Sequence, residues 1–191
     1  MTTPLPPTGP GDSLSLREVM RLLAASKLPP VDKWHPEHCG DSDMRIAADG
    51  TWFHQRTPIG RPAMVKLFST ILRREADGSH VLVTPVEKLD IAVDDAPFVA
   101  VELRSEGEGR ERKLGFRLNV EDWVIADSEH RLRIDIADDG TPRPYLHVRG
   151  GLEALINRPV FYELVELALA EDATPLGLWS DGTFFTIGAA Q

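Results

Sequence analysis

The sequence predicts an α+β fold built from two related units, each with antiparallel strands and one helix. Strand-like runs bounded by turn residues outnumber helical segments over most of the 191 residues. Asp-Gly followed by a hydroxyl residue occurs four times, at 49–51, 77–79, 139–141 and 181–183. A longer pattern also recurs, because Trp52–Arg56 and Arg61-Pro62 return as Tyr145–Arg149 and Arg158-Pro159. These observations together indicate an internal duplication.

The N-terminal part precedes the first unit. Residues 1–12 contain four prolines and little apolar surface, so we predict a flexible tail. A short helix is expected over Ser15–Ser26, where Ser15 and Glu18 have the spacing of a capping box. We assign residues 13–86 to this helix and the first unit, and residues 87–191 to a β-rich second unit.

One helix is predicted in each unit, over residues 62–74 and 159–170. Both segments begin with proline, which favours the first turn of a helix. Apolar residues recur at helical spacing in both, as Met64, Leu67, Phe68 and Ile71 in the first and Phe161, Leu164, Val165 and Ala168 in the second. Each helix is therefore expected to pack one apolar face against a sheet.

The stretch between the two helices is rich in strand-like runs. They cover residues 81–83, 89–93, 98–103, 113–118, 123–126 and 132–136, and turn residues separate nearly all of them. Closely spaced strands with few helices indicate an antiparallel, curved sheet closed by a helix.

Composition excludes several classes of protein. The hydrophobic fraction of 42% is typical of a folded domain. A net charge of -9 disfavours nucleic-acid polymers and anionic membranes as partners, because both are bound through clustered cations. The single cysteine and the lack of a signal peptide or long apolar run predict a cytoplasmic protein without a membrane span.

The repeated motif supplies the main candidate binding residues. Alternation along a strand places Trp52, His54 and Arg56 on one side, and likewise Tyr145, His147 and Arg149. A ring can stack on a planar group, and arginine suits phosphate or carboxylate, so the expected ligand is small, anionic and nucleotide-like. Alternatively, the rings belong to the core while His and Arg pair with nearby carbonyls and carboxylates.

Further candidates lie at helix starts and bends. Arg61 and Arg158 precede the two helix-starting prolines. Thr84, Glu87 and Lys88 flank Pro85 at a bend between strands, although Glu87 and Lys88 could instead form a solvated surface pair. If the two copies pack face to face, these residues would line a cleft between them.

Metal binding and catalysis receive little support. His35, His38, Cys39, Asp41 and Asp43 share one loop, but their spacing matches no structural zinc site, so we expect neither a metal nor a cofactor. No Gly-x-Ser-x-Gly elbow or phosphate-binding loop occurs. Acid or base catalysis by His54 or His147 on a phosphorylated or nucleotide substrate is the alternative.

Several motifs resemble the bacterial domain-of-unknown-function family 1285. They are Trp34-x-Pro36-x-x-Cys39-Gly40, Asp49-Gly50-Thr51-Trp52-x-His54, Pro58-Ile59-x-Arg61, Leu67-Phe68-Ser69, Val83-Thr84-Pro85-Val86-Glu87-Lys88 and Asp95-Ala96-Pro97-Phe98. The resemblance runs from about Pro30 to the C-terminus. It implies a duplicated fold whose C-terminal half is pleckstrin-homology-like, with a small-molecule site between the halves.

The resemblance also carries functional expectations. The matching positions are His54, Arg61, Thr84, Glu87 and Lys88, and the family has been linked to a nucleotide-based ligand and to signal transduction. We therefore expect a ligand-binding regulatory protein rather than an enzyme. A protein-interaction module that uses an exposed sheet edge, and hence a protein partner, is the third alternative.

Overall fold

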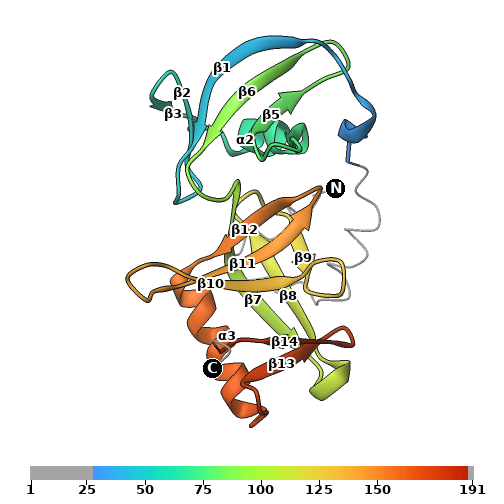
Figure 1. Ribbon diagram of the computed structural model, residues 1–191, viewed down its shortest axis with the longest axis vertical. Helices are drawn as coiled ribbons and strands as arrows, with labels where there is room; N and C mark the ends of the chain where they lie inside the picture. The colour runs from blue at the N-terminus through green and yellow to red at the C-terminus, as the bar shows by residue number, and fades with distance from the viewer. Residues whose placement is uncertain (1–27, 189–191) are drawn as a thin grey trace, which may run out of the picture.

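Two stacked units make up the described part of the molecule, residues 28–188, in a computed structural model (Figure 1). The predicted flexible tail and the predicted helix within residues 13–26 lie outside the described residues. Within residues 28–188, no helix has the length and apolar character needed to cross a membrane.

The first unit is a six-stranded sheet with one α-helix. Its strands are β1 (His38–Ile46), β2 (Trp52–His54), β3 (Thr57–Pro58), β4 (Leu72–Arg74), β5 (His80–Val83) and β6 (Lys88–Val93), in the order β3-β2-β1-β6-β5-β4. The short 3-10 helix η1 (Val31–Lys33) precedes them, and α2 (Pro62–Thr70) joins β3 to β4. The sheet arches over α2 (Figure 1).

The second unit contains a six-stranded sheet, one α-helix and a separate hairpin. Its sheet strands are β7 (Phe98–Glu106), β8 (Lys113–Leu118), β9 (Trp123–Ile125), β10 (Leu132–Ile136), β11 (Pro142–Arg149) and β12 (Leu152–Ile156), in the order β10-β11-β12-β7-β8-β9. The 3-10 helix η2 (Gly109–Glu111) lies between β7 and β8, α3 (Arg158–Ala170) follows β12, and β13 (Gly177–Ser180) pairs with β14 (Thr183–Thr186).

The predicted duplication is confirmed, and it is visible in the strand pairing. Each sheet consists of two three-stranded antiparallel meanders joined by one parallel pair, β1 with β6 and β7 with β12. Strands β1–β6 therefore correspond to β7–β12 in order. The predicted antiparallel strands form the meanders, and the one parallel pair in each sheet arises because the first and last strands of that sheet in chain order are neighbours.

The residue correspondence inferred from the repeated motif was wrong. In chain order, Trp52 lies on β2, the second strand of the first sheet, whereas Tyr145 lies on β11, the fifth strand of the second sheet. The two helices differ as well, since α2 joins the third and fourth strands while α3 follows the sixth. The motif had matched two hairpins that occupy different places in the same topology.

Asp-Gly turns explain that error. In three of them the aspartate accepts a hydrogen bond, at 2.9 Å, from the backbone nitrogen two residues later: Asp49 from Thr51, Asp77 from Ser79 and Asp139 from Thr141. The fourth is a tighter turn in which Asp181 and Gly182 both have positive φ, as a two-residue hairpin requires. The same local chemistry therefore closes hairpins at unrelated positions.

Helix boundaries follow the sequence signals closely, with one exception. The side chain of Asn157 caps α3 by accepting a hydrogen bond from the Val160 nitrogen at 3.0 Å. Helix α2 ends at Thr70 rather than at residue 74, because Leu72–Arg74 pair with β5 as strand β4. Leu72 is buried there, which stabilises the strand instead of a longer helix.

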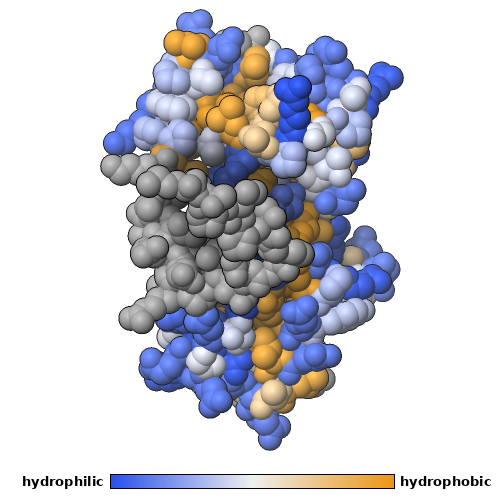
Figure 2. Space-filling model, turned by 180° about the vertical axis from the view of Figure 1, so that it is seen from behind, coloured by the Kyte–Doolittle hydropathy of each residue, from blue (hydrophilic) through white to orange (hydrophobic). Residues whose placement is uncertain are grey.

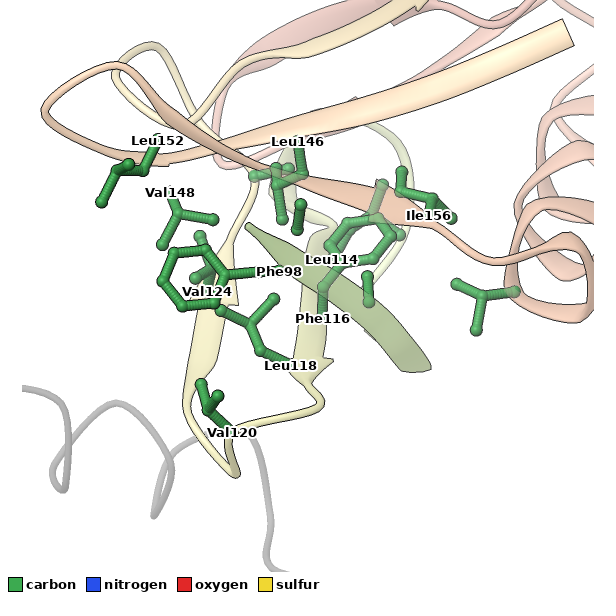
Figure 3. Close-up of a cluster of buried hydrophobic side chains, with 14 of the residues drawn as sticks. Phe98, Leu114, Phe116, Leu118, Val120, Val124, Leu146, Val148, Leu152 and Ile156 are labelled. Carbon is green, nitrogen blue, oxygen red and sulfur yellow. The ribbon is translucent and has the colours of Figure 1, made fainter. Parts of the chain in front are cut away.

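The core is concentrated in the curled sheet of the second unit (Figure 3). Phe98, Leu114, Phe116, Leu118, Leu146 and Ile156 point into its interior, and each is at most 2% exposed. The inner face of α3, formed by Val160, Leu164 and Ala168, joins the same cluster. A curved sheet closed by a helix, as predicted for this half, is therefore present.

The boundary between the units lies after β6. The sequence predicts it between residues 86 and 87, but Lys88–Val93 pair with both β1 and β5 in the first sheet. A short connection, residues 94–97, then leads to β7.

Candidate functional site

A hollow of about 140 Å³ lies where the two units meet. From the first unit it is lined by the end of β4 and the start of β5, and from the second by β10, β11, β12 and the β11–β12 turn. The connection between the units completes it. The lining residues are Arg74, His80, Asp95, Ala96, Pro97, Arg133, Tyr145, Gly151 and Glu153.

On the second-unit side, charged groups neutralise one another. Arg133 donates two hydrogen bonds to Glu153, from Nε to Oε1 at 2.7 Å and from Nη2 to Oε2 at 2.8 Å, and it also contacts Asp135. These carboxylates, Glu153 first, raise the pKa of the Arg133 guanidinium. The same guanidinium lies 4.2 Å from the centre of the Tyr145 ring. This wall is therefore ordered and internally paired.

Tyr145 ties this wall to the connection between the units. Its hydroxyl donates to Oδ1 of Asp95 at 2.8 Å, and Nη2 of Arg143 donates to Oδ2 of the same carboxylate at 2.7 Å. Burial, followed by the hydrogen bond to Asp95, raises the pKa of Tyr145 to about 12. The phenol therefore stays protonated at neutral pH and acts as a hydrogen-bond donor.

Polar groups on the first-unit side have fewer hydrogen-bond and ion-pair partners among the described residues. Nη1 of Arg74 donates to the carbonyl oxygen of Gly151 at 3.1 Å, and Arg74 forms no ion pair with any residue of 28–188. The half-buried ring of His80 makes no hydrogen bond within that range. Burial, and then the positive charge of Arg74, lowers the pKa of His80, so its imidazole is neutral at pH 7. Arg74 and His80 therefore offer polar groups that no side chain of the described region satisfies.

Arg149, a predicted ligand residue, instead joins the two units. Its Nη2 donates to the carbonyl oxygen of Ser69, at the C-terminal end of α2, at 2.6 Å. A cation at this end of a helix satisfies an orphan carbonyl and complements the helix dipole. The Arg149 guanidinium lies 5.2 Å from the centre of the buried Phe98 ring, and burial lowers the pKa of Arg149.

His147 has both ring nitrogens engaged. Nδ1 lies 2.8 Å from the carbonyl oxygen of Glu129, and Nε2 accepts a hydrogen bond from the backbone nitrogen of Gly151 at 3.3 Å. In this arrangement Nδ1 is the ring nitrogen that donates and Nε2 the one that accepts. The side chain thus supports the β11–β12 turn, whose Gly151 carbonyl holds Arg74.

The candidates of the first unit lie apart from Tyr145. Trp52 is 1% exposed in the core, and its Nε1 has no hydrogen-bond partner among the residues that the structure describes. His54 and Arg56 are exposed at the β2–β3 hairpin, which projects from the side of the first sheet (Figure 1). Arg61 and Arg158 are exposed at the starts of α2 and α3. The two His-x-Arg segments therefore do not converge on one surface.

Thr84, Glu87 and Lys88 lie at the β5–β6 turn, at the opposite end of β5 from His80. The Thr84 hydroxyl accepts a hydrogen bond from the Glu87 nitrogen at 3.0 Å, and Lys88 lies 3.8 Å from a carboxylate oxygen of Glu75. These contacts stabilise the turn and the sheet edge.

Of the ligand residues predicted from the sequence, Tyr145 alone lines the hollow. Asp95 belongs to one of the motifs shared with the family, Asp95-Ala96-Pro97-Phe98, whereas the sequence pattern assigns Arg74 to a helix. Arg133, Glu153 and His80 carry no local signal, because only the packing of the two units brings them together.

The described residues contain another hollow and no metal site. A more open hollow of about 490 Å³ is lined by Arg110, Glu111, Lys113, Asp181 and Gly182, and it lies within the second unit alone. Its Lys113 and Asp181 are already 3.4 Å apart as an ion pair. Within residues 28–188, no group of three or more His, Cys, Asp or Glu side chains is arranged to hold a metal ion.

Comparison with known families adds an evolutionary context. Residues 29–96 match the family described as "Domain of unknown function (DUF1285), N-terminal domain", and residues 97–187 match "Protein of unknown function (DUF1285), C-terminal domain". The chain belongs to the DUF1285 family. The junction between the two matches coincides with the β6–β7 connection and with the Asp95–Pro97 side of the hollow.

Two solved DUF1285 structures resemble the chain. A DUF1285 family protein from Silicibacter pomeroyi DSS-3 is 50% identical, with a TM-score of 0.77 over 88% of this chain and 93% of that one. A DUF1285 family protein from Shewanella baltica OS155 is 26% identical, with a TM-score of 0.53 over 68% of this chain and 94% of that one. No curated protein matches the chain.

Proposed function

We propose that this DUF1285 protein binds a small anionic ligand in the hollow between its two units. The observation that carries the proposal is the pair Arg74 and His80, whose polar groups face the hollow without a carboxylate partner in the described region. What distinguishes Arg74 from the other exposed arginines is its place in the hollow, beside the half-buried His80. Guanidinium groups bind phosphate and carboxylate through several N–H donors.

The size of the hollow limits the ligand. A volume of about 140 Å³ corresponds to roughly five water molecules at about 30 Å³ each. Pockets that enclose drug-sized ligands measure about 300–1,000 Å³. Phosphate, sulfate or a small carboxylate fits this volume, whereas a nucleotide would place only a phosphate group inside and leave its base on the surface.

A regulatory role is supported better than a catalytic one. A ligand held by Arg74 and Tyr145 would contact both units and favour one relative arrangement of them. His54 and His147, the two candidate acid–base residues, do not line the hollow. The single cysteine, Cys39, is consistent with the cytoplasmic location that we also propose.

Thermal unfolding in the presence of sulfate, phosphate, small carboxylates and AMP tests the proposal. A ligand at 100 times its dissociation constant should add about 2.7 kcal/mol to the free energy of unfolding. Arg74→Ala should abolish the shift, while Arg56→Ala, an exposed arginine on the β2–β3 hairpin, should retain it. Equal shifts in both variants, or no shift with any anion, would overturn the proposal.

A further inference from the structure

Helix α2 has an apolar outer face that no described residue covers. Its inner residues Val65 and Phe68 pack against the core, but Met64 is 38% exposed and Leu67 is 63% exposed. Ala63 is exposed beside them. Apolar residues accordingly gather on this part of the first unit's surface (Figure 2). A surface helix normally presents polar residues to water, so this face invites a partner.

The same chain contains a segment whose sequence predicts an amphipathic helix, which would require an apolar surface to pack against. Residues 1–27 precede the described part, and within them Leu16, Val19, Met20 and Leu23 form an apolar stripe at helical spacing. An isolated helix of about 12 residues is only marginally stable in water. A segment of this kind therefore requires an apolar surface against which to fold.

Position favours α2 as that surface. Nη1 of Arg73 donates to the carbonyl oxygens of Val31 and Trp34, at 2.9 Å and 2.7 Å. These bonds fix the first described residues beside the strand that directly follows α2. A helix over residues 15–26 would be about 18 Å long, against about 14 Å for the nine residues of α2, and four connecting residues span up to about 14 Å. The segment can therefore reach the outer face of α2.

We propose that residues 15–26 dock on the outer face of α2, formed by Ala63, Met64 and Leu67. Because the connection is short, the effective concentration of the segment lies in the millimolar range, so a small apolar contact suffices. A second copy of the chain would need a total buried area of about 1,000 Å² or more.

Docking at this place bears on the arrangement of the two units. Lys66 of α2 forms an ion pair with Asp122 of the second unit at 3.1 Å, and the C-terminal end of α2 is held by Arg149. The segment would therefore stabilise a helix that takes part in the contact between the two units.

Hydrogen exchange of the full-length chain tests the proposal. In the wild type, amides of residues 17–26 should exchange at least tenfold more slowly than in an unstructured peptide of the same sequence. Leu67→Asp should remove this protection. Leu169→Asp, which changes an equally exposed leucine on α3, should leave it intact. Leu23→Asp alters the segment itself and should also remove the protection, without loss of protection in the sheets.

Three results would overturn the proposal. One is rapid exchange of residues 17–26 in the wild type. Another is protection that survives Leu67→Asp or disappears equally in Leu169→Asp. The third is protection that depends on protein concentration, with Leu67→Asp converting dimers to monomers in sedimentation, because the face would then serve a second copy.

Discussion

The two sheets share one strand order but join their outer strands differently. In the first sheet, β3 and β4 lie at opposite edges, and α2 crosses the concave face to connect them. In the second, the equivalent strands β9 and β10 are connected by residues 126–131 alone. Such a short connection requires the edges to approach each other, so the second sheet is curled while the first remains an open arch (Figure 1).

This difference is reflected in the core. Of the eleven largest fully buried side chains in the described region, only Ile46, Trp52 and Leu72 belong to the first unit. The other eight lie in the second, where α3 and the β13–β14 hairpin add to the sheet. We therefore expect the core of the second unit to stabilise that unit by itself, whereas the stability of the first unit depends on contacts across the interface.

Removing a central core side chain of the second unit should have the largest effect. Phe116 is fully buried within the curled sheet, so Phe116→Ala should lower the free energy of unfolding by about 3–5 kcal/mol. Because the stability of the first unit is expected to depend on its contacts with the second, amides of both sheets should lose hydrogen-exchange protection together. Urea unfolding and native-state exchange measure the two quantities.

The matched substitution in the first unit is Leu72→Ala, at a leucine that is 1% exposed. We expect it to cost about 2–5 kcal/mol and to remove protection from β1–β6 only. If Leu72→Ala also unfolds β7–β12, the dependence is mutual and the comparison fails.

The next effect concerns a close approach between the units. Gly50 has φ +84°, and a Cβ atom there would lie 2.5 Å from Nδ2 of Asn119 and 2.9 Å from Cγ2 of Val99. Gly50→Ala should therefore cost about 2–4 kcal/mol, from the left-handed conformation together with the steric conflict across the interface. Thermal unfolding measures the loss.

Gly140 provides the control for this substitution. It occupies the same kind of Asp-Gly turn with φ +80°, but nothing lies within 4 Å of its Cβ position. Gly140→Ala should cost only the conformational term of about 1–2 kcal/mol. Equal losses for the two variants would mean that the interface tolerates the added methyl group.

A smaller effect is expected from the bond between Arg149 and the end of α2. Arg149→Met keeps much of the side-chain volume but removes the hydrogen bond to Ser69, so stability should fall by about 1.5–3 kcal/mol. Exchange should quicken most in α2 and β4. Arg158→Met, at an exposed helix start, should change stability by less than about 0.5 kcal/mol, and a similar loss there would contradict the assignment.

Local patterns predicted much of the fold. The runs over residues 113–118 and 132–136 are strands with those bounds, and the helix predicted to start at Pro159 starts at Arg158. The apolar residues of these elements recur with a clear strand or helix periodicity, so the sequence alone identifies them. Leu72–Arg74 were assigned to the wrong element because their strand forms only by pairing with β5.

The correspondence between the units was beyond local patterns. Asp-Gly turns look alike wherever they close a hairpin, so similar residues around 49–56 and 139–149 suggested equivalent positions. The topology instead pairs the turn at 77–79 with that at 139–141, since both join the fourth and fifth strands of their sheets. Only the long-range pairing of β1 with β6 and of β7 with β12 reveals this.

The candidate site was predictable only at Tyr145. An aromatic residue on a strand was a reasonable candidate, and it lines the hollow through its contact with Asp95. Arg74 and His80 come from the first unit, at the opposite side of the interface. They are candidate ligand residues because no carboxylate of the described region pairs with them. That property depends on the tertiary structure and cannot be predicted from the sequence.

The smallest expected effect tests the electrostatics of His80. Because its pKa is lowered in the folded protein, the unfolded chain binds more protons as the pH falls through about 6.5, the ordinary value. The side chain should therefore have little influence on stability above this pH and should destabilise the fold below it. His80→Gln should lose less stability than the wild type between pH 7 and pH 5. His54→Gln, at an exposed position, should follow the wild type.

Sulfate, whose charge is constant over this range, extends the same prediction to the hollow. An anion beside Arg74 favours the protonated form of His80, so sulfate should bind more tightly at pH 5.5 than at pH 7.5. The dependence should flatten in His80→Gln, and sulfate should offset part of the acid destabilisation of the wild type. A pH dependence that persists unchanged in His80→Gln would place the responsible group elsewhere. It would also leave the first unit's contribution to the hollow with Arg74 alone.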